Sequence, residues 1–238
     1  GAESLAGYGH HEVVIESPRH DVDLASLSDS EIEAVLATYR RRFVWLSGQP
    51  RIARVILFRN HGPSSGASLA HPHAQLIALP MHAAVARAWC EQHGRCVLCD
   101  EMERERADGR RVLAETGSFT AFVPFAAACP FETWIVPRRH QASFAETERA
   151  ELREMGLLLR DVLCRLKSAR GDPPYNLVVD SAGPTESDRP DLHWRLRIVP
   201  GLATPGGFEL GSGMRINPSS PEDDAGALRA AEGYARRR

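Results

Sequence analysis

A dense run of polar residues from Asn60 to Gln75 has the composition of a site that handles phosphate. The run reads Asn-His-Gly-Pro-Ser-Ser-Gly-Ala-Ser-Leu-Ala-His-Pro-His-Ala-Gln. Gly62, Gly66 and the serines predict a flexible loop whose backbone N–H groups can approach phosphate oxygens closely. A neutral imidazole can attack phosphorus, and a phosphorylated ring nitrogen is a good leaving group in the return step. The run therefore favours group transfer through a histidine over the simpler alternative of a surface His-Pro-His in a polar loop.

The residues that follow the loop are expected to form a strand, because the apolar run Leu-Ile-Ala-Leu comes directly after Gln75. Side chains alternate along a strand, so we expect His71, His73 and Gln75 to lie on one face. Two imidazoles and an amide would then point into the same space. The amide of Gln75 could donate to a phosphoryl oxygen as negative charge develops there.

The elements around this run occur twice along the chain. Each copy has the order strand, helix, strand, loop, strand: the first comprises 12–16, a helix from about 28, 54–58 and 71–80, and the second comprises 133–136, 146–168, 175–179 and 193–200. Matching histidines mark the copies, because 51 positions separate His20 from His71 and 53 separate His140 from His193. The repeat predicts an α+β fold with two tandem halves, each a small antiparallel sheet with a packed helix. We place these halves at 1–88 and 89–238; chance recurrence is the alternative.

The cysteine pair that precedes the second copy has no counterpart before the first. Cys96 lies 44 residues before His140, and the same offset from His20 would fall upstream of residue 1. If the repeat is real, the first half has lost its opening strands. We therefore expect this chain to be truncated at its N-terminus.

The polar run resembles the active-site signature of galactose-1-phosphate uridylyltransferases, a branch of the histidine-triad superfamily. That signature is Asn-x-Gly-x(3)-Gly-x-Ser-x(2)-His-x-His-x-Gln, and the run fills it at the right spacing. The likeness continues through Ser17-Pro18-x-His20, Pro130-Phe131-Glu132 and the stretch 207–218. It implies two histidine-triad-like halves, with His73 as the nucleophile that becomes nucleotidylated and Gln75 steadying the phosphoryl group. The remaining roles that it implies are phosphate contacts for Asn60, Gly62, Gly66 and Ser68, and hexose contacts for Phe208 and Glu209.

Cysteine and histidine spacing also points to metal. Zinc is commonly held by two cysteines and two histidines, and such a set is available here as Cys96, Cys99, His140 and His193. Free thiols beside ordinary surface histidines are the alternative. The resemblance further implies that His20 and His71 are two ligands of a structural zinc whose cysteines would lie upstream. A rival arrangement has Cys96 and Cys99 joining His20 and His71 in a single site, which would leave the other two histidines unexplained.

Taken together, these features predict a ping-pong nucleotidyltransferase acting through His73, with a nucleotide sugar and a sugar 1-phosphate, or phosphate, as substrates. The expected activity is UDP-glucose:hexose-1-phosphate (galactose-1-phosphate) uridylyltransferase. An ADP-glucose phosphorylase is a sibling alternative, and a non-catalytic, zinc-stabilised nucleotide-binding module is the alternative from another class. The positions equivalent to His73 and Gln75 in the second half are Arg195 and Arg197. Arginine stays protonated and cannot act as the nucleophile, so we expect the second half to be catalytically silent.

The overall composition and charge limit the classes of protein to which this chain could belong. The 238 residues are 43% hydrophobic and 25% charged, with a formal net charge of -2. This balance gives no reason to expect a nucleic-acid or membrane surface, and no apolar run reaches the roughly 18 residues of a membrane span. We expect a cytoplasmic protein, and the family resemblance implies a homodimer.

Overall fold

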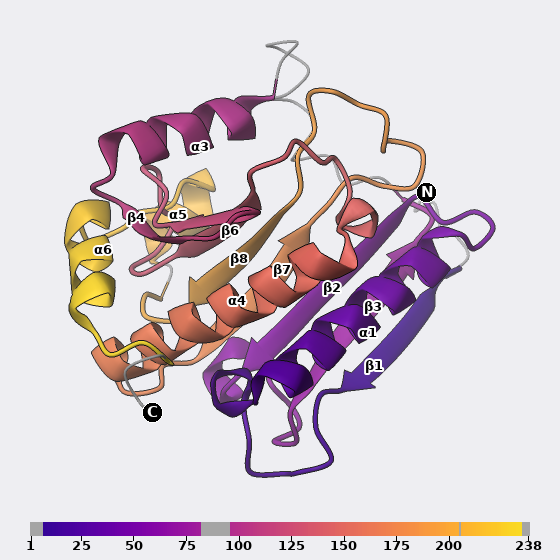
Figure 1. Ribbon diagram of the computed structural model, residues 1–238, viewed down its shortest axis with the longest axis horizontal. Helices are drawn as coiled ribbons and strands as arrows, with labels where there is room; N and C mark the ends of the chain where they lie inside the picture. The colour runs from indigo at the N-terminus through magenta and orange to yellow at the C-terminus, as the bar shows by residue number, and fades with distance from the viewer. Residues whose placement is uncertain (1–6, 82–95, 205, 235–238) are drawn as a thin grey trace.

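The computed structural model describes residues 7–81, 96–204 and 206–234 (Figure 1). Its strands are β1 His10–Ile15, β2 Arg54–His61, β3 His73–Leu79, β4 Val112–Glu115, β5 Phe119–Phe122, β6 Thr133–Pro137, β7 Tyr175–Asp180 and β8 Arg195–Pro200. The α-helices are α1 Asp29–Ser47, α3 Val97–Asp108, α4 Arg149–Arg170, α5 Gly207–Ser212 and α6 Pro221–Ala230. The expected boundary between residues 88 and 89 lies outside the described residues.

All eight strands form one antiparallel sheet in the order β1-β3-β2-β7-β8-β6-β5-β4. The order β1-β3-β2 in the first half is mirrored by β7-β8-β6 in the second, which confirms that the two copies repeat one fold. The two small sheets expected from the sequence are joined edge to edge, because β2 pairs with β7. The hairpin of β4 and β5, which lies outside the repeated pattern, extends the sheet at one edge.

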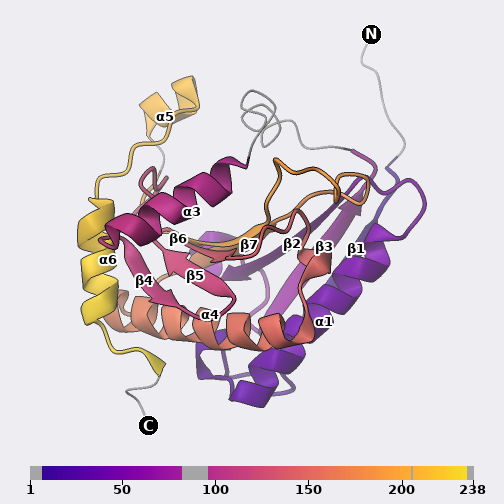
Figure 2. The same ribbon diagram turned by 45° about the horizontal axis from the view of Figure 1, so that its top comes forward.

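Two long helices cover one face of this sheet, as Figure 2 shows for α1 and α4. Helix α1 begins where the capping-box pair Ser28 and Glu31 predicts, and each of these side chains accepts a hydrogen bond from the other's backbone N–H. The two helices pack against each other across the junction of the halves. The inward residues of the strands, such as Leu57 and Leu76, are fully buried beneath them. A single core therefore spans both halves.

Helix α3 covers the opposite face of the sheet in the second half only. Its Met102 forms a buried cluster with Phe122, Trp134 and Val136 of β5 and β6. In the first half, the side chains that β1 presents on this face are open to solvent, with Ile15 58% exposed. Helix α6 closes the end of the fold against α4 and β4, while α5 projects from the body (Figure 2). In the part of the chain that the structure describes, no helix has the length and apolar character that crossing a membrane requires.

Candidate active site

The glycine-rich loop connects β2 to β3 at the centre of the first half. Gly62 and Gly66 have φ values of +84° and +91°, a region that glycine enters without the steric cost of a Cβ atom. Between them Pro63–Ser65 form one 3-10 turn. Backbone bonds from Ser65 and Ala67 to the Gly62 carbonyl close the loop, at 3.2 and 3.4 Å. The loop therefore has a defined shape without any ligand.

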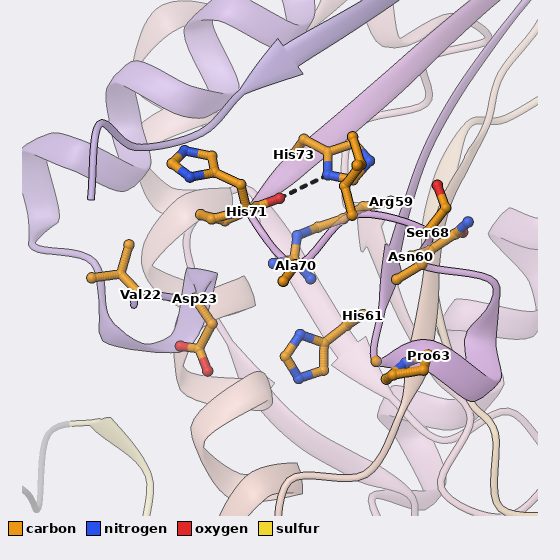
Figure 3. Close-up of a pocket in the computed structure, with 14 residues that line it drawn as sticks. Val22, Asp23, Arg59, Asn60, His61, Pro63, Ser68, Ala70, His71 and His73 are labelled. Atoms are coloured by element: carbon orange, nitrogen blue, oxygen red, sulfur yellow. Dashed lines mark hydrogen bonds between the residues drawn. The ribbon is translucent and has the colours of Figure 1, made fainter. Parts of the chain in front are cut away.

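A cavity of about 500 Å³ lies between this loop and the segment after β1 (Figure 3). The residues that line it include Asn60, Gly62, Ser68, His71 and His73 from the sequence signature. The structure thus brings most of the expected phosphate contacts to one place. Gly66 lies in the same loop, where the Asn60 amide donates to its carbonyl at 3.2 Å.

His73 is the first residue of β3 and its side chain is buried, with 7% of the residue exposed. Its Nδ1 atom lies 2.8 Å from the backbone oxygen of His71 (Figure 3). A carbonyl oxygen can only accept, so Nδ1 carries the proton in this hydrogen bond. In the neutral ring the lone pair then lies on Nε2, which is the atom available for attack on phosphorus.

His71 lines the same cavity as His73, but it does not share the strand face of His73, so the expectation of one common face is wrong for His71. His71 precedes β3, so the alternation of a strand does not apply to it, and its ring turns towards His20 instead. The two Nδ1 atoms lie 3.1 Å apart, and His71 Nε2 lies 2.8 Å from the oxygen of Ser17. Gln75 does lie on the face of His73, and its Oε1 atom accepts from His11 at 2.8 Å.

A buried ion pair lies behind the cavity and was not found from the sequence. Arg59 Nε lies 2.9 Å from a carboxylate oxygen of Glu16, and the side chains are 3% and 1% exposed. Tyr39 donates to Glu16, and Arg59 Nη1 lies 3.0 Å from the hydroxyl of Tyr175. Burial alone would lower the pKa of Arg59, but Tyr175 and Glu16 outweigh it and raise that pKa. The sequence did contain one signal for this pair, because Arg59 stands at an inward position of a largely apolar strand.

His61 lines the same cavity. Its Nε2 atom lies 3.2 Å from Asp172, and Asp23 completes a group of three ligand-type side chains. The ammonium of Lys167 lies 2.8 Å from Asp23 and 3.4 Å from Asp172. This ammonium therefore supplies positive charge to both carboxylates of the group.

A second cluster of ligand-type residues joins α3 to two loops of the second half. Cys99 Sγ lies 3.3 Å from His140 Nδ1 and 3.2 Å from His193 Nδ1. With Cys96, these four ligand atoms all lie within 4.8 Å of one another. A tetrahedral zinc ion with ordinary bond lengths separates sulfur and nitrogen ligands by about 3.6 Å. The donor set and the spacing therefore fit zinc.

Burial shifts the protonation of this cluster in opposite directions. It raises the pKa of the Cys99 thiol to about 12, and it lowers the pKa of His193 to about 4, with the neighbouring His140 adding to the latter effect. The structure places Cys96 and Cys99 with these histidines and not with His20 and His71. Within residues 7–81, 96–204 and 206–234, no group of three or more ligand side chains includes His20 or His71.

Phe208 and Glu209, the expected hexose contacts, are not brought to the cavity. Both lie in α5, which projects from the end of the molecule near α3 and α6 (Figure 2). Phe208 is 55% exposed, and Glu209 accepts a hydrogen bond from the N–H of Gly206 at 3.0 Å. Within this chain they lie apart from His73.

Comparison with known proteins agrees with this architecture. The chain is 35% identical over 237 residues to the ADP-glucose phosphorylase of Arabidopsis thaliana, covering 96% of this chain and 66% of that protein. It is 30% identical over 246 residues to the galactose-1-phosphate uridylyltransferase of Thermotoga maritima, covering 93% and 74%. The crystal structure of an ADP-glucose phosphorylase from Arabidopsis thaliana with bound ADP-glucose superimposes with a TM-score of 0.87 at 34% identity, covering 96% and 74%. The chain thus spans just under two thirds of the plant phosphorylase sequence.

Family-level matches cover both halves. Residues 3–82 match the N-terminal domain, and residues 83–197 the C-terminal domain, of the family described as galactose-1-phosphate uridyl transferase. The chain therefore belongs to the galactose-1-phosphate uridyl transferase family.

Proposed function

We propose that this protein is a nucleotidyltransferase that carries a nucleoside monophosphate on Nε2 of His73. The observation that carries the proposal is the 2.8 Å contact between His73 Nδ1 and the His71 carbonyl oxygen. That contact selects the tautomer with a lone pair on Nε2, beside a loop suited to phosphate. It also stabilises the positive charge that the ring acquires when Nε2 becomes bonded to phosphorus, because a charged donor strengthens the hydrogen bond.

The reaction proceeds in two balanced steps. Nε2 of His73 attacks the α-phosphorus of a nucleotide sugar, and the bond from that phosphorus to the bridging oxygen breaks. The sugar 1-phosphate leaves with the electron pair. An oxygen of an acceptor phosphate then attacks the same phosphorus, and the N–P bond breaks to return the pair to Nε2. Two in-line displacements of this kind are a ping-pong exchange.

The surrounding residues supply charge stabilisation for both steps. Ser68 donates to the phosphoryl oxygens, with Asn60 beside it, on a loop whose own backbone bonds fix its shape. Gln75 lies on the face of His73, where its amide N–H serves the transferred group while Oε1 is held by His11. The guanidinium of Arg59 borders the cavity and adds positive charge, although Glu16 neutralises part of it.

We propose ADP-glucose as the donor to test first and UDP-glucose as the second. The resemblance of the signature alone favours the uridylyl donor, because the motif is that of the uridylyltransferases. Support for the adenylyl donor comes from the phosphorylase, which is 35% identical to this chain, against 30% for the Thermotoga enzyme. With ADP-glucose the acceptor is inorganic phosphate, and with UDP-glucose it is a hexose 1-phosphate.

We also propose that Cys96, Cys99, His140 and His193 hold a structural zinc ion. When bound, zinc would tie the first turn of α3 to the loops that precede α4 and β8. His20 and His71 are proposed as two ligands of a further zinc. Because the backbone of His71 binds His73 while its side chain faces His20, holding this side chain also fixes the nucleophile.

The position of α5 supports a homodimer in which each subunit completes the other's site. Phe208 and Glu209 are the hexose contacts implied by the family motif, yet α5 stands apart from the cavity of its own chain. Its exposed apolar side chains include Leu210, at 78%, and Met214 lies just beyond it, at 58%. Apolar surface of this kind is characteristic of a segment that packs on a partner.

The test is intact-protein mass spectrometry after incubation with ADP-glucose and, separately, with UDP-glucose. We expect one nucleoside monophosphate to be added to the wild type and none to the His73→Ala variant. The donor that gives the adduct identifies the base. No adduct with either donor, in folded and zinc-loaded protein, would leave the non-catalytic nucleotide-binding module as the function.

A further inference from the structure

One side chain of the second half reaches across the sheet into the active-site loop of the first. Asn176 in β7 lies opposite Asn60 in β2, in the antiparallel pair that joins the two halves. Its Nδ2 atom lies 2.8 Å from Asn60 Oδ1 and 2.8 Å from the backbone oxygen of Ser65. Asn60 Nδ2 in turn lies 3.2 Å from the backbone oxygen of Gly66. The two amides therefore connect β7 to two consecutive backbone carbonyls of the loop.

The orientation of both amides is determined by the backbone. The carbonyl oxygens of Ser65 and Gly66 can only accept hydrogen bonds, so each must face an NH₂ group. Asn60 therefore presents its oxygen to Asn176, which must donate. Turning either amide over would place two acceptors or two donors face to face. Asn176 uses both of its N–H groups in this arrangement, and one N–H of Asn60 is used by Gly66, which leaves that amide a second N–H for a phosphate oxygen.

Residues at the start of β7 and just before it contact the start of the loop. A Cβ atom on Gly62 would lie 3.0 Å from Pro174, so the loop approaches the second half as closely as glycine allows. The ring of His61 stacks on Tyr175, with 4.7 Å between centroids, and contacts Asp172 through Nε2. The start of the loop thus packs against residues 172–176.

We propose that Asn176 is a positioning residue for nucleotidyl transfer, which it serves by fixing the Asn60 amide and the loop around Ser65. This proposal rests on the proposed function at His73. It gives the catalytically silent half a task in the reaction, because a residue of that half sets the orientation of a phosphate contact in the other. The loop leads from β2 to β3, whose first residue is His73, so a displaced loop misplaces the phosphoryl group relative to Nε2.

The test compares Asn176→Asp with the control Val178→Thr. The carboxylate in N176D has the shape of the amide but can only accept, so it cannot serve Asn60 Oδ1 or the Ser65 carbonyl. Val178 lies two residues along β7 on the same face and opposite Phe58, and V178T preserves its shape. We expect N176D to slow single-turnover nucleotidylation of His73 by roughly 10- to 100-fold, as a misplaced reacting group does. Thermal unfolding should stay close to wild type, and V178T should react at the wild-type rate.

Asn176→Ala removes the two N–H donors without adding a charge. This second variant keeps the test decisive if N176D does not fold. Its rate should also fall, and steady-state kinetics should show the loss in kcat more than in the KM of either substrate. A role in stability alone would lower the melting temperature and leave the rate of the folded protein unchanged. Wild-type rates in both folded variants would overturn the proposal.

Hydrogen exchange separates failure of this inference from failure of the proposed function. The N–H groups of Ser65, Gly66 and Ala67 are bonded within the loop, to carbonyls 3.1 to 3.4 Å away. We expect N176D to accelerate their exchange, whether or not the protein transfers nucleotides. If the wild type forms no adduct but exchange is faster in N176D, the transfer reaction fails and the loop contact remains. Unchanged exchange in N176D would contradict the contact itself.

Discussion

Asp180 and Arg195 face each other across β7 and β8, and Asp180 Oδ2 lies 3.1 Å from Arg195 Nε. The guanidinium of Arg195 also lies over the ring of Trp134, 3.7 Å from its centroid. The same carboxylate approaches Arg197 Nε at 2.7 Å. Both arginines are therefore held in ion pairs on the face of the sheet that carries His73 in the other half.

The strand registers show what these arginines replace. Arg197 lies opposite Val178 in the pair of β7 and β8, as Gln75 lies opposite Phe58 in the pair of β2 and β3. Arg195, two residues before Arg197, therefore occupies the position of His73. A protonated guanidinium in an ion pair has no lone pair to offer to phosphorus.

Removal of this arginine should leave the covalent chemistry intact. We expect Arg195→Ala to accept one nucleoside monophosphate per chain at a rate within a few-fold of wild type, because Arg195 occupies the position of His73 in the second half and cannot act as a nucleophile. His73→Ala should accept none. Intact-mass spectrometry after incubation with the nucleotide sugar measures both. An R195A protein that folds but carries no adduct would show that the second half takes part in the chemistry.

The buried ion pair of Glu16 and Arg59 should matter far more for stability than an exposed pair. Arg59→Met leaves the carboxylate buried without its partner, which costs about 3–5 kcal/mol. The matched control is Arg19→Ala, which breaks an exposed pair with Glu31 and should cost no more than about 1 kcal/mol. Urea denaturation measures both losses. Equal losses in the two variants would contradict the burial of the Glu16–Arg59 pair.

The repeat could be predicted from the sequence, and His73 could be singled out as the proposed nucleophile, because both inferences depend on local order. Strand and helix periodicities and the spacing of His20, His71, His140 and His193 are visible in one chain. The signature around His73 is similarly compact. The mirrored strand order then follows from two copies of one pattern, although the sequence does not show which edges of the two sheets meet.

The contacts that the sequence did not reveal arise where the edges of the two small sheets meet, at β2 and β7. Asn176 and Tyr175 contact the loop only because β2 pairs with β7. Arg59 lies on β2 and acquires its partners because β7 pairs with one edge of β2 and the end of β1 lies beyond β3 on the other side. His71 was assigned to the strand face because the strand was expected two residues too early, a common error at the ends of elements. Contacts between distant segments of this kind have no local signal.

Zinc binding at the cysteine cluster should be strongly dependent on pH. Burial raises the pKa of Cys99 to about 12, so in metal-free protein at pH 7 this thiol is protonated, and zinc must displace its proton. The pKa of His193 is lowered to about 4, so no proton competes there near neutrality. Zinc affinity should therefore rise with pH from 6 to 8, about tenfold per unit for each proton released.

Calorimetric titration of chelator-treated protein with zinc, in buffers of different ionisation enthalpy, measures the number of protons released. Chelation should also lower the melting temperature, because the four ligands are brought together in the folded state. The control is Cys129→Ser, because Cys129 is also a partly buried thiol with a pKa of about 12 but lies outside the cluster. Zinc uptake without proton release, or uptake unaffected by Cys99→Ser, would contradict the assignment.

Two inactive variants should complement each other if α5 serves the partner's site. Glu209→Ala removes the proposed hexose contact and His73→Ala removes the nucleophile, so each homodimer should be impaired at both sites. In a mixed dimer, one site takes His73 from one subunit and Glu209 from the other. Random assembly makes half of the dimers mixed, which restores about one quarter of wild-type activity. Co-expression with two affinity tags allows the mixed species to be purified, and its activity should be about half of wild type because one of its two sites is intact.

The two arrangements of α5 give different results in the same assay. If α5 instead folds back onto its own cavity, both sites of every mixed dimer carry one defect, and no activity returns. A matched control is the mixture of H73A with R195A, in which the R195A subunits are expected to be active without help. Recovery in the H73A and E209A mixture, at unchanged total protein, would therefore assign Phe208 and Glu209 to the neighbouring subunit's site. If dimers shown to be mixed recover no activity, Phe208 and Glu209 either serve the site of their own chain or do not contribute to a site.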